Sequence, residues 1–318
     1  MTAPRPLVSI GIPVYNGELS IREALNALVA QSYDNLELII SDNASTDLTG
    51  EICEEYATKD SRVKYFRNSV NIGLYANYRR ALSLATGEYF IWAAVDDLKP
   101  PKAIEQCVNA LSRNHRAVIA HGIVLVRAPG ADELFEFPNV VQASDQNAAA
   151  RIRRFARGIE HNAMIYGLYR LNVLKQATFG NHMGQDYLLC LQMCLLGEIE
   201  YVGVPMIIFS YRHPAPTKEP MYVDGAITLG TLFSANRLQR RKCWTVLIVG
   251  VYYLATRGDV SFGERLRAVW AHINSHCSLY RLRLAKELVF QLFQPIAWLT
   301  TLARRRFTAV RSALANRA

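Results

Sequence analysis

LVSIGIPVYNGELSIREALNALVAQSYDNLELIISDNASTD, residues 7–47, is the stretch that decides the expected fold. Its first part, residues 7–14, is an uncharged apolar run followed by an Asn-Gly turn signal, which predicts a buried strand. Residues 20–31 place apolar side chains at helical spacing, and residues 36–42 form a second apolar run. Parallel strands need a crossover of this kind between them, so the stretch predicts a parallel α/β sheet.

The same alternation continues as far as residue 126. We expect Ser20 and Glu23 to form a capping box, Asp47 to cap the second helix, and Gly87 to end the third. Repeated strand–helix units predict an open, mostly parallel sheet with helices on both faces. The further elements expected are strands at 63–66, 89–96 and 117–126 and helices at 48–59, 74–87 and 102–114.

Polar residues follow each of the first four expected strands. Open α/β sheets bind ligands at the carboxyl ends of their strands. One polar residue there is more often a turn former, but four consecutive strand ends with amide or carboxylate groups indicate a ligand site. These residues are Pro13, Tyr15 and Asn16 after the first strand, Asp42 and Asn43 after the second, Asn71 and Gly73 after the third, and Asp96 and Asp97 after the fourth.

Asp96 and Asp97 stand side by side at the end of the apolar run 89–95. An Asp in this position commonly caps a helix or forms a turn. Two adjacent carboxylates repel each other, which favours a nearby cation, and Mg²⁺ or Mn²⁺ prefers oxygen ligands. The absence of GxGxxG after the first strand and of GxxxxGK[ST] anywhere argues against a dinucleotide site and a P-loop. A bound diphosphate would therefore need a metal ion to neutralise it.

The composition is that of a folded protein. With 318 residues, 51% hydrophobic and 20% charged, the chain has room for one large domain and an appendage, and general disorder is excluded. The six cysteines form no CxxC pair, which indicates buried thiols in a reducing compartment. The first residues lack the basic start and long apolar stretch of a signal peptide, so we expect a cytoplasmic protein.

The net charge of +9 is unevenly distributed. Residues 1–215 hold 20 Lys and Arg against 22 Asp and Glu, whereas residues 216–318 hold 16 against 5. We therefore expect a main domain over 1–215 and a basic helical region over 216–318. Its apolar run at 243–256 is too short to span a bilayer, and residues 279–318 mix Leu, Phe and Trp with Arg at helical spacing. This region either attaches peripherally to the inner, anionic face of the cell membrane or forms a helical cap on the main domain.

Three motifs together resemble the inverting family 2 glycosyltransferases of the GT-A fold. They are residues 8–47, NIG at 71–73, and ATGEYFIWAAVDDLKPP at 85–101, and the resemblance covers residues 1–215. It implies an enzyme that uses Mn²⁺ or Mg²⁺ and a UDP- or dTDP-linked sugar. The sugar would pass to a hydroxyl of a saccharide or lipid-linked acceptor, in the synthesis of a surface polysaccharide or glycolipid.

The resemblance also implies roles for individual residues. Many members read Asp-x-Asp-Asp where this chain reads Ala94-Val95-Asp96-Asp97, so the first carboxylate is missing and the Asp that touches the metal stays open. The implied nucleotide-sugar contacts are Pro13, Tyr15, Glu18, Asp42, Asn71, Arg79 and Asp96, and the implied metal ligands are Asp96 and Asp97.

The resemblance places the catalytic base at Asp186, in a Gln185–Asp186 pair before an apolar helical stretch. Such a base accepts the proton of the acceptor hydroxyl, which attacks opposite the diphosphate and inverts the anomeric carbon. The residues alone fit an N-cap at Asp186 equally well. The two roles are compatible, because a helix N-terminus keeps a carboxylate ionised.

Two histidines receive different interpretations. His213, in MIIFSYRHPAP at 206–216, is a candidate phosphate donor or metal ligand, and a solvated strand end is the alternative. His121 lies within an apolar strand and is expected to be a buried core residue.

Two other functions compete with sugar transfer. A sugar-nucleotide pyrophosphorylase would need a Gly-rich loop with Arg and Lys after the first strand, and PVYNGE is not such a loop. A non-catalytic scaffold or nucleic-acid-binding protein would use the basic region. The near-neutral main domain and the lack of a nucleic-acid-binding module argue against it, so we expect no nucleic-acid partner.

Overall fold

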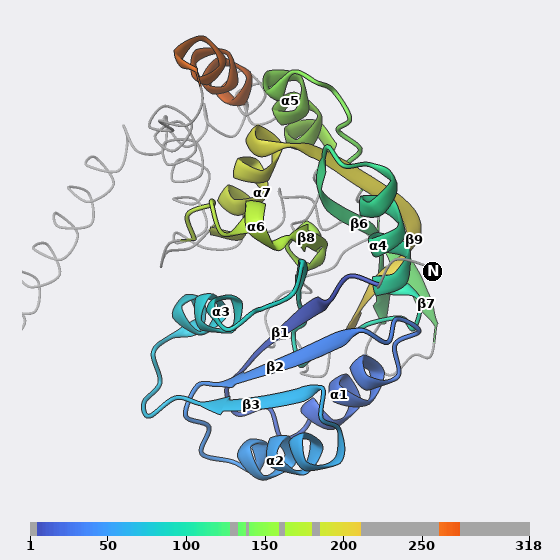
Figure 1. The fold of residues 1–318 in the computed structure, drawn as a ribbon, viewed down its shortest axis with the longest axis vertical. Coiled ribbons are helices and arrows are strands. Elements are labelled where there is room, and N and C mark those ends of the chain that lie inside the picture. Colours follow the sequence, from blue (N-terminus) through green and yellow to red (C-terminus); the bar gives the residue numbers. More distant parts are fainter. Residues whose placement is uncertain are drawn as a thin grey trace, which may run out of the picture. The chain divides into compact units, whose positions relative to one another are not determined.

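The computed structural model of the chain describes residues 5–127, 133–137, 140–158, 163–179, 185–210 and 261–273. All of them lie in the first of two compact units, Met1–Ile273, and the second unit is Asn274–Ala318. The described part contains a nine-stranded sheet with helices packed on it (Figure 1).

The strands are β1 (Val8–Val14), β2 (Leu36–Asp42), β3 (Val63–Arg67), β4 (Tyr89–Trp92), β5 (Asp97–Leu98), β6 (Ala117–Arg127), β7 (Leu134–Phe137), β8 (Leu168–Arg170) and β9 (Glu198–Ser210). The helices are α1 (Ile21–Val29), α2 (Thr49–Lys59), α3 (Leu74–Ser83), α4 (Ala103–Arg113), α5 (Ala148–Gly158), α6 (Leu171–Leu174), α7 (Gln185–Leu196), the 3₁₀ turn η1 (Ala163–Tyr166) and a helix at 262–273.

The first four strands form a parallel half-sheet. β1 pairs in parallel with β2 and β4, and β2 pairs in parallel with β3. In this register Val14 lies opposite Asp42, and Asp42 lies opposite Arg67. The carboxyl ends of β1, β2 and β3 therefore reach the same edge, as the alternating sequence pattern predicted.

Beyond β4 the sheet is mixed. β8 pairs antiparallel with β4 and β6, β6 and β9 are parallel, and β5 and β7 add antiparallel pairs with β9 and β6. The strand order is β3-β2-β1-β4-β8-β6-β9-β5, with β7 beside β6. The predicted α/β sheet flanked by helices is confirmed, but an unbroken parallel pattern holds for the first half only, because the second half combines the parallel pair β6–β9 with antiparallel pairs. β8 is too short to carry a periodicity signal.

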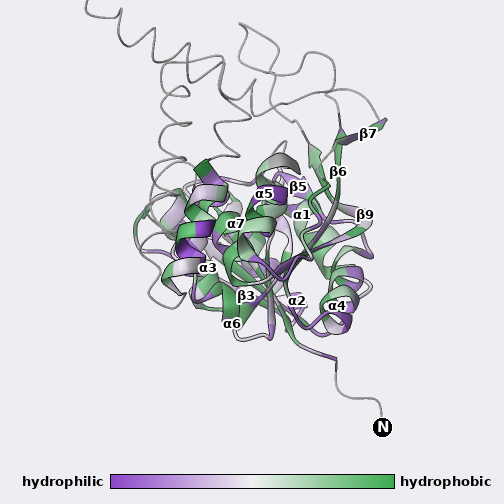
Figure 2. Cartoon of the chain, turned by 90° about the horizontal axis from the view of Figure 1, so that it is seen from above, coloured by the Kyte–Doolittle hydropathy of each residue, from purple (hydrophilic) through white to green (hydrophobic). Residues whose placement is uncertain are grey.

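Alternating residues of the central strands pack on different helices. Ile10 and Ile12 of β1 belong to one buried cluster with α1, α2 and α4. Phe90 and Trp92 of β4 belong to the other, with α5, α7 and the helix at 262–273. In Figure 2 α4 carries both hydrophobic and hydrophilic residues, as expected of a helix that buries one face.

Two glycines set the position of α3. A Cβ on Gly11 of β1 would lie 2.6 Å from the Phe90 ring and 3.2 Å from Ala81 of α3, so the glycine permits the close approach of α3 to the sheet. Gly73, immediately before α3, has a φ of +86°, a backbone conformation that glycine adopts without steric cost.

One predicted helix boundary is wrong, and one predicted cap lacks its hydrogen bond. Ser20 does hold the N-cap position of α1, but it makes no capping hydrogen bond, and its hydroxyl lies 3.4 Å from the carbonyl oxygen of Gly17 instead. α3 ends at Ser83 and not at Gly87. A Cβ on Gly87 would lie 2.6 Å from the carbonyl oxygen of Leu7, so this glycine serves a close contact between two chain segments.

Most of the expected basic region lies outside the described residues, including 243–256 and 279–318. The domain boundary after residue 215 therefore stays a prediction. The helix at 262–273 buries Ala268 and Ala271 in the cluster that contains α5 and α7. Four cysteines, Cys53, Cys107, Cys190 and Cys194, are free and buried as expected, and the other two lie outside the described residues.

Candidate active site

Hydrogen bonds join the loops that follow β1 and β2. Asn16, in the left-handed conformation with a φ of 50°, accepts a bond of 2.8 Å from the Thr46 amide. The Gly17 amide donates to the Thr49 hydroxyl at 2.8 Å. Pro13 is buried within β1, so Tyr15, which is 49% exposed, is the first side chain of this segment that can meet a ligand.

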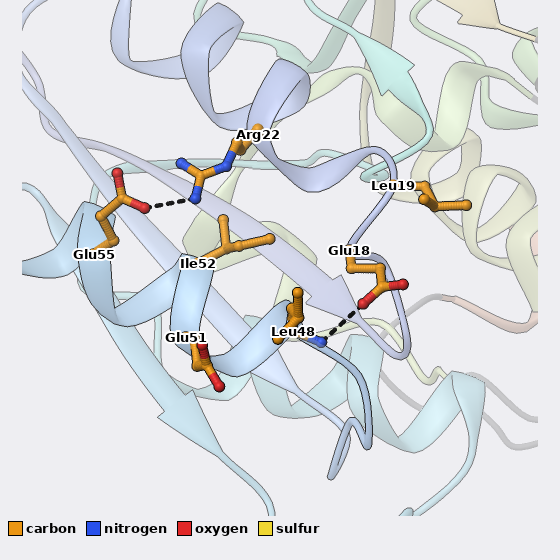
Figure 3. Close-up of a pocket in the computed structure, with 7 residues that line it drawn as sticks. All are labelled: Glu18, Leu19, Arg22, Leu48, Glu51, Ile52 and Glu55. Carbon is orange, nitrogen blue, oxygen red and sulfur yellow. Dashed lines mark hydrogen bonds and ion pairs between the residues drawn. The ribbon is translucent and has the colours of Figure 1, made fainter.

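Glu18 faces a different part of the molecule. Its carboxylate accepts a 3.0 Å bond from the Leu48 amide, and its own amide donates to Asp47. Asp47 also accepts from the Thr49 amide at 3.1 Å, so it does bond the first turn of α2, although Leu48 holds the N-cap position. Glu18 lines a groove of about 560 Å³ between α1 and α2 together with Glu51 and Glu55 (Figure 3). Arg22 also lines the groove, and its guanidinium pairs with Glu55.

Asp42 is fully buried and its oxygens are turned inward. They accept bonds from the Ser45 amide (2.9 Å), the Tyr65 hydroxyl (2.7 Å) and the Arg67 guanidinium (2.7 Å). Burial, followed by the hydrogen bond to Asp42, raises the pKa of Tyr65 to about 12. The side chain of Arg67 is 47% exposed, so the group that Asp42 offers to the edge of the sheet is this guanidinium. Sequence reasoning did not select Arg67, although a basic residue closing the third strand was visible.

A chain of amides fixes the ends of β2 and β3 against α3. Asn71 accepts bonds from the Asn43 side chain (2.8 Å) and the Gly73 amide (2.9 Å). The Asn68 side chain donates to Asn43 at 3.0 Å and to Asn77 of α3 at 3.1 Å. Asn43, Asn68 and Asn77 are buried, and Asn71 is the exposed end of the chain.

Three carboxylates predicted from separate segments meet around Tyr78 of α3. Burial raises the pKa of Tyr78 to about 12, a hydrogen bond with Tyr166 acts in the opposite direction, and the negative charges of Asp96, Asp97 and Asp186 raise the pKa further. The pKa of Tyr166 is likewise raised by burial, by Tyr78 and by Asp97 and Asp96. The two phenols therefore mark one acidic region that the loop after β4 and α7 form together.

Two of these acids have no partner in the part of the chain that the structure describes. Among the described residues, Asp96 and Asp186 receive no hydrogen bond and form no ion pair. Asp96 is exposed and Asp186 is half-buried. Asp186 is the second residue of α7 and lies within its first turn rather than at an N-cap.

Lys99 lies close to this acidic region and was also missed by sequence reasoning. Its ammonium donates to the Tyr166 carbonyl at 2.9 Å, and the residue is 4% exposed. Burial lowers the pKa of Lys99 to about 8, while Cys107 and Asp97 act in the opposite direction. The positive charge of this buried ammonium partly offsets the negative charge of the nearby carboxylates.

The remaining predicted site residues lie elsewhere. Arg79 donates to the Phe179 carbonyl at 3.1 Å and so contacts the segment before α7. His213 lies outside the described residues. His121 is a buried core residue as expected, with Nε2 2.8 Å from the Val141 carbonyl oxygen, and burial lowers its pKa to about 4.

The donor set at Asp96 and Asp97 fits a hard divalent ion. Within the described part of the chain, no group of three or more His, Cys, Asp or Glu side chains is arranged to hold a metal. Mg²⁺-type ions bind through one or two carboxylates and complete their shell with substrate phosphate and water. Two neighbouring carboxylates meet that requirement.

The parallel half-sheet, with polar residues at its carboxyl edge, defines an open α/β domain of a ligand-binding type. Residues 9–174, over half of the chain, match the family described as Glycosyl transferase family 2, and the chain belongs to that family. The predicted family and fold are confirmed.

Curated relatives agree with this assignment. The putative glycosyltransferase EpsE of Bacillus subtilis is 38% identical over 122 residues, which cover 38% of this chain and 44% of that protein. An uncharacterized glycosyltransferase of Haemophilus influenzae is 37% identical over 109 residues, 34% of each chain. Uncharacterized protein Mb1547 of Mycobacterium bovis is 30% identical over 214 residues, 66% of this chain and 60% of that protein. The chain thus spans about a third to three fifths of the length of these relatives.

Solved structures share the fold. S. aureus TarS 1–349 in complex with UDP-GlcNAc superposes with a TM-score of 0.60 at 18% identity, covering 86% of this chain and 73% of that one. The mannosyltransferase PcManGT of Pyrobaculum calidifontis in complex with GDP-Man and Mn²⁺ superposes with a TM-score of 0.51 at 15% identity, covering 94% and 84%.

Proposed function

We propose that the protein is a metal-dependent, inverting glycosyltransferase that moves a sugar from a nucleotide-diphospho-sugar to an acceptor hydroxyl. The observation that carries this proposal is the meeting of Asp96, Asp97 and Asp186 around Tyr78. A site with two acids for a cation and a further acid for a proton matches what such a transfer needs.

The donor nucleotide would lie over the carboxyl ends of β1, β2 and β3. Tyr15 follows β1, Arg67 ends β3 and Asn71 follows β3, and all three residues are exposed. We assign Asp42 the role of holding Arg67, because its own oxygens are occupied. The complexes of TarS with UDP-GlcNAc and of PcManGT with GDP-Man support a nucleotide-sugar donor, UDP- or dTDP-linked in this proposal.

Asp96 and Asp97 would hold the Mn²⁺ or Mg²⁺ ion. When bound, such an ion supplies positive charge that stabilises the leaving diphosphate. The positive charge of Lys99 partly balances the negative charge of Asp97. His213 remains a candidate further ligand or phosphate donor.

Asp186 would act as the base. It is half-buried, free of hydrogen bonds from described residues, and placed in the first turn of α7. An acceptor hydroxyl within hydrogen-bond reach gives its proton to Asp186 as its oxygen attacks the anomeric carbon. Attack from the side opposite the diphosphate gives inversion.

The test is a donor screen with the full chain. Purified protein is incubated with UDP-, dTDP- and GDP-linked sugars and a panel of acceptors, with Mn²⁺ or with EDTA, and release of nucleoside diphosphate and the anomeric form of the product are measured. We expect metal-dependent release with inversion. A protein that binds RNA or DNA in a salt-sensitive manner and consumes no sugar nucleotide would support the scaffold alternative.

We also propose that the protein attaches to the surface of an anionic membrane, where a lipid-linked acceptor of polysaccharide or glycolipid synthesis would be reached. No helix in the described part of the chain is long and apolar enough to cross a bilayer. The helix at 262–273 instead exposes Phe262 (72%), Leu266 (60%) and Trp270 (68%) at a spacing of four residues, opposite buried Ala268 and Ala271.

Large exposed apolar residues on one side of a helix suit the interfacial region of a bilayer, and Arg265 and Arg267 supply nearby positive charge. Sedimentation with phosphatidylglycerol vesicles tests this attachment. We expect the triple substitution F262A/L266A/W270A to weaken binding, whereas Leu19→Ala, at an equally exposed position of the α1 end, should not. Equal binding of the triple variant would contradict the role of this helix.

A further inference from the structure

The backbone of Thr178 and Phe179, just before α7, is held from two sides. Gln192 of α7 donates from Nε2 to the Thr178 carbonyl and accepts at Oε1 from the Thr178 amide, both at 2.9 Å. Arg79 of α3 donates to the Phe179 carbonyl at 3.1 Å. Gln192 is 2% exposed in an otherwise apolar helix, and burying its amide is costly unless it is hydrogen-bonded. The fold therefore fixes this short segment firmly.

The fixed segment places the ring of Phe179 against two other aromatic rings. Phe179 stacks on Trp92, with centroids 5.7 Å apart and an interplanar angle of 24°. It meets Tyr75 of α3 edge to face, at 6.2 Å and 66°. Trp92 is fully buried and forms the base of this arrangement. Tyr75 and Phe179 are half-buried, and we refer to these two side chains as the aromatic wall.

The aromatic wall lies against the helix that carries the proposed base, because Gln192 of α7 holds the Thr178 backbone next to Phe179. Burial raises the pKa of Tyr75, and the charge of Asp186 raises it further. The Tyr75 hydroxyl forms no hydrogen bond with any described residue. A half-buried phenol without a partner among the described residues is available to a ligand hydroxyl.

We propose that the aromatic wall binds the acceptor, and that the acceptor group seated there is a pyranose ring. This inference rests on the proposed function and names the substrate class at its acceptor side. The C–H face of the sugar packs on Phe179, because the face of an aromatic ring carries partial negative charge that attracts C–H groups. The Tyr75 hydroxyl bonds one sugar hydroxyl, which leaves a neighbouring hydroxyl directed at Asp186.

The aromatic wall and the proposed nucleotide contacts come from different segments of the chain. Tyr75 and Phe179 come from α3 and the segment before α7, whereas the proposed nucleotide contacts follow β1, β2 and β3. A ring with several hydroxyls fits a surface that combines a stacking face with a free hydrogen-bonding group. A simple aliphatic alcohol would use only the apolar part of that surface.

The experiment compares acceptor probes in wild type and variants, with the donor found active. The ring probes are methyl glycosides of glucose, galactose, mannose and N-acetylglucosamine, and the non-ring probes are glycerol, ribitol and n-octanol. We expect the ring probes to be preferred. Phe179→Ala should raise the acceptor KM about tenfold, and Phe179→Leu, which keeps an apolar side chain, should raise it severalfold. Phe179→Tyr should restore the wild-type KM, and the donor Kd should stay unchanged throughout.

Tyr75→Phe tests the hydroxyl separately and should lower kcat/KM for ring probes about tenfold. Tyr201→Ala is the matched control, since Tyr201 is a half-buried aromatic residue on β9 that meets His121 edge to face. Preference for non-ring probes would contradict the proposal that the aromatic wall binds a pyranose acceptor. Unchanged acceptor KM values in Phe179→Ala and Tyr75→Phe would contradict it as well. Either result would leave the proposed function intact. A wild-type protein that consumes no sugar nucleotide would overturn the proposed function and this inference with it.

Discussion

The amino-terminal end of the parallel half-sheet and the region around Tyr78 treat negative charge in opposite ways. At the amino-terminal end, Glu37 of β2 is buried and accepts bonds from the Ser9 hydroxyl (2.6 Å) and the Thr86 amide (2.7 Å) while it pairs with Lys64. Burial alone would raise the pKa of Glu37, but hydrogen bonds from Lys64, Ser9 and Thr86 outweigh it and lower the pKa to about 2.

In the region around Tyr78, Asp96 and Asp186 have no such donors among the described residues, and their negative charges both raise the pKa of Tyr78. A carboxylate surrounded by its own donors stabilises the fold, whereas carboxylates gathered without them remain available to a cation or a proton.

The largest effect is expected at the base. Asp186→Asn should lower kcat for sugar transfer by about a thousandfold, because the amide cannot accept the acceptor proton. The measurement is product formation at saturating donor and acceptor, with the melting temperature as a check on folding. Asp34→Asn, which alters a 78% exposed carboxylate, is the control. Near-normal transfer by folded Asp186→Asn would remove the central assignment.

The metal site should respond differently from the base. Asp97→Asn and Asp96→Asn should each raise the Mn²⁺ concentration for half-maximal activity by about tenfold or more, because each removes a negative charge and an oxygen ligand. Asp186→Asn should leave that concentration unchanged. Titration of EDTA-treated protein with Mn²⁺ measures all three. If Asp186→Asn shifted the metal requirement as strongly as the other two, the proposed separation of duties would be wrong.

At the amino-terminal end of the half-sheet, substitution of Glu37 should change stability alone. Glu37→Gln should lower the free energy of unfolding by about 2 kcal/mol, because it removes the ion pair with Lys64 and one buried acceptor. Urea denaturation measures the change, and kcat should remain within about twofold of wild type, since Glu37 touches no proposed ligand. Glu54→Gln, at an exposed carboxylate, should change the unfolding free energy by less than about 0.5 kcal/mol. Loss of activity without loss of stability in Glu37→Gln would contradict the comparison.

The difference in unfolding free energy between wild type and Glu37→Gln should depend on pH. The folded-state pKa of Glu37, about 2, lies below its ordinary value of 4.5, so its contribution is fully present above pH 4.5 and is lost as the pH falls toward 2. The difference in unfolding free energy between wild type and Glu37→Gln should shrink over that window. A difference that stayed constant down to pH 3 would show that the ionised carboxylate is not the stabilising species.

The sequence predicted more about position along the strands than about the direction of side chains. The strand ends carrying Asp42, Asn71 and Asp96 fall at the edge where the pattern placed them. Asp42 nonetheless turns inward to Arg67, and Glu18 faces the groove between α1 and α2. Neither outcome is visible locally, because each depends on a donor from another segment of the chain.

Periodicity and the order of the motifs were enough to establish the alternating strands and helices and the family, since both depend on neighbouring residues. Tertiary structure alone decided which acids are neutralised within the protein and which gather at the edge around Tyr78. It also placed Phe179 against Tyr75 and Trp92. Charge pairing and ring stacking act between residues distant in sequence, and only the packing of α3 and α7 on the sheet brings those residues together.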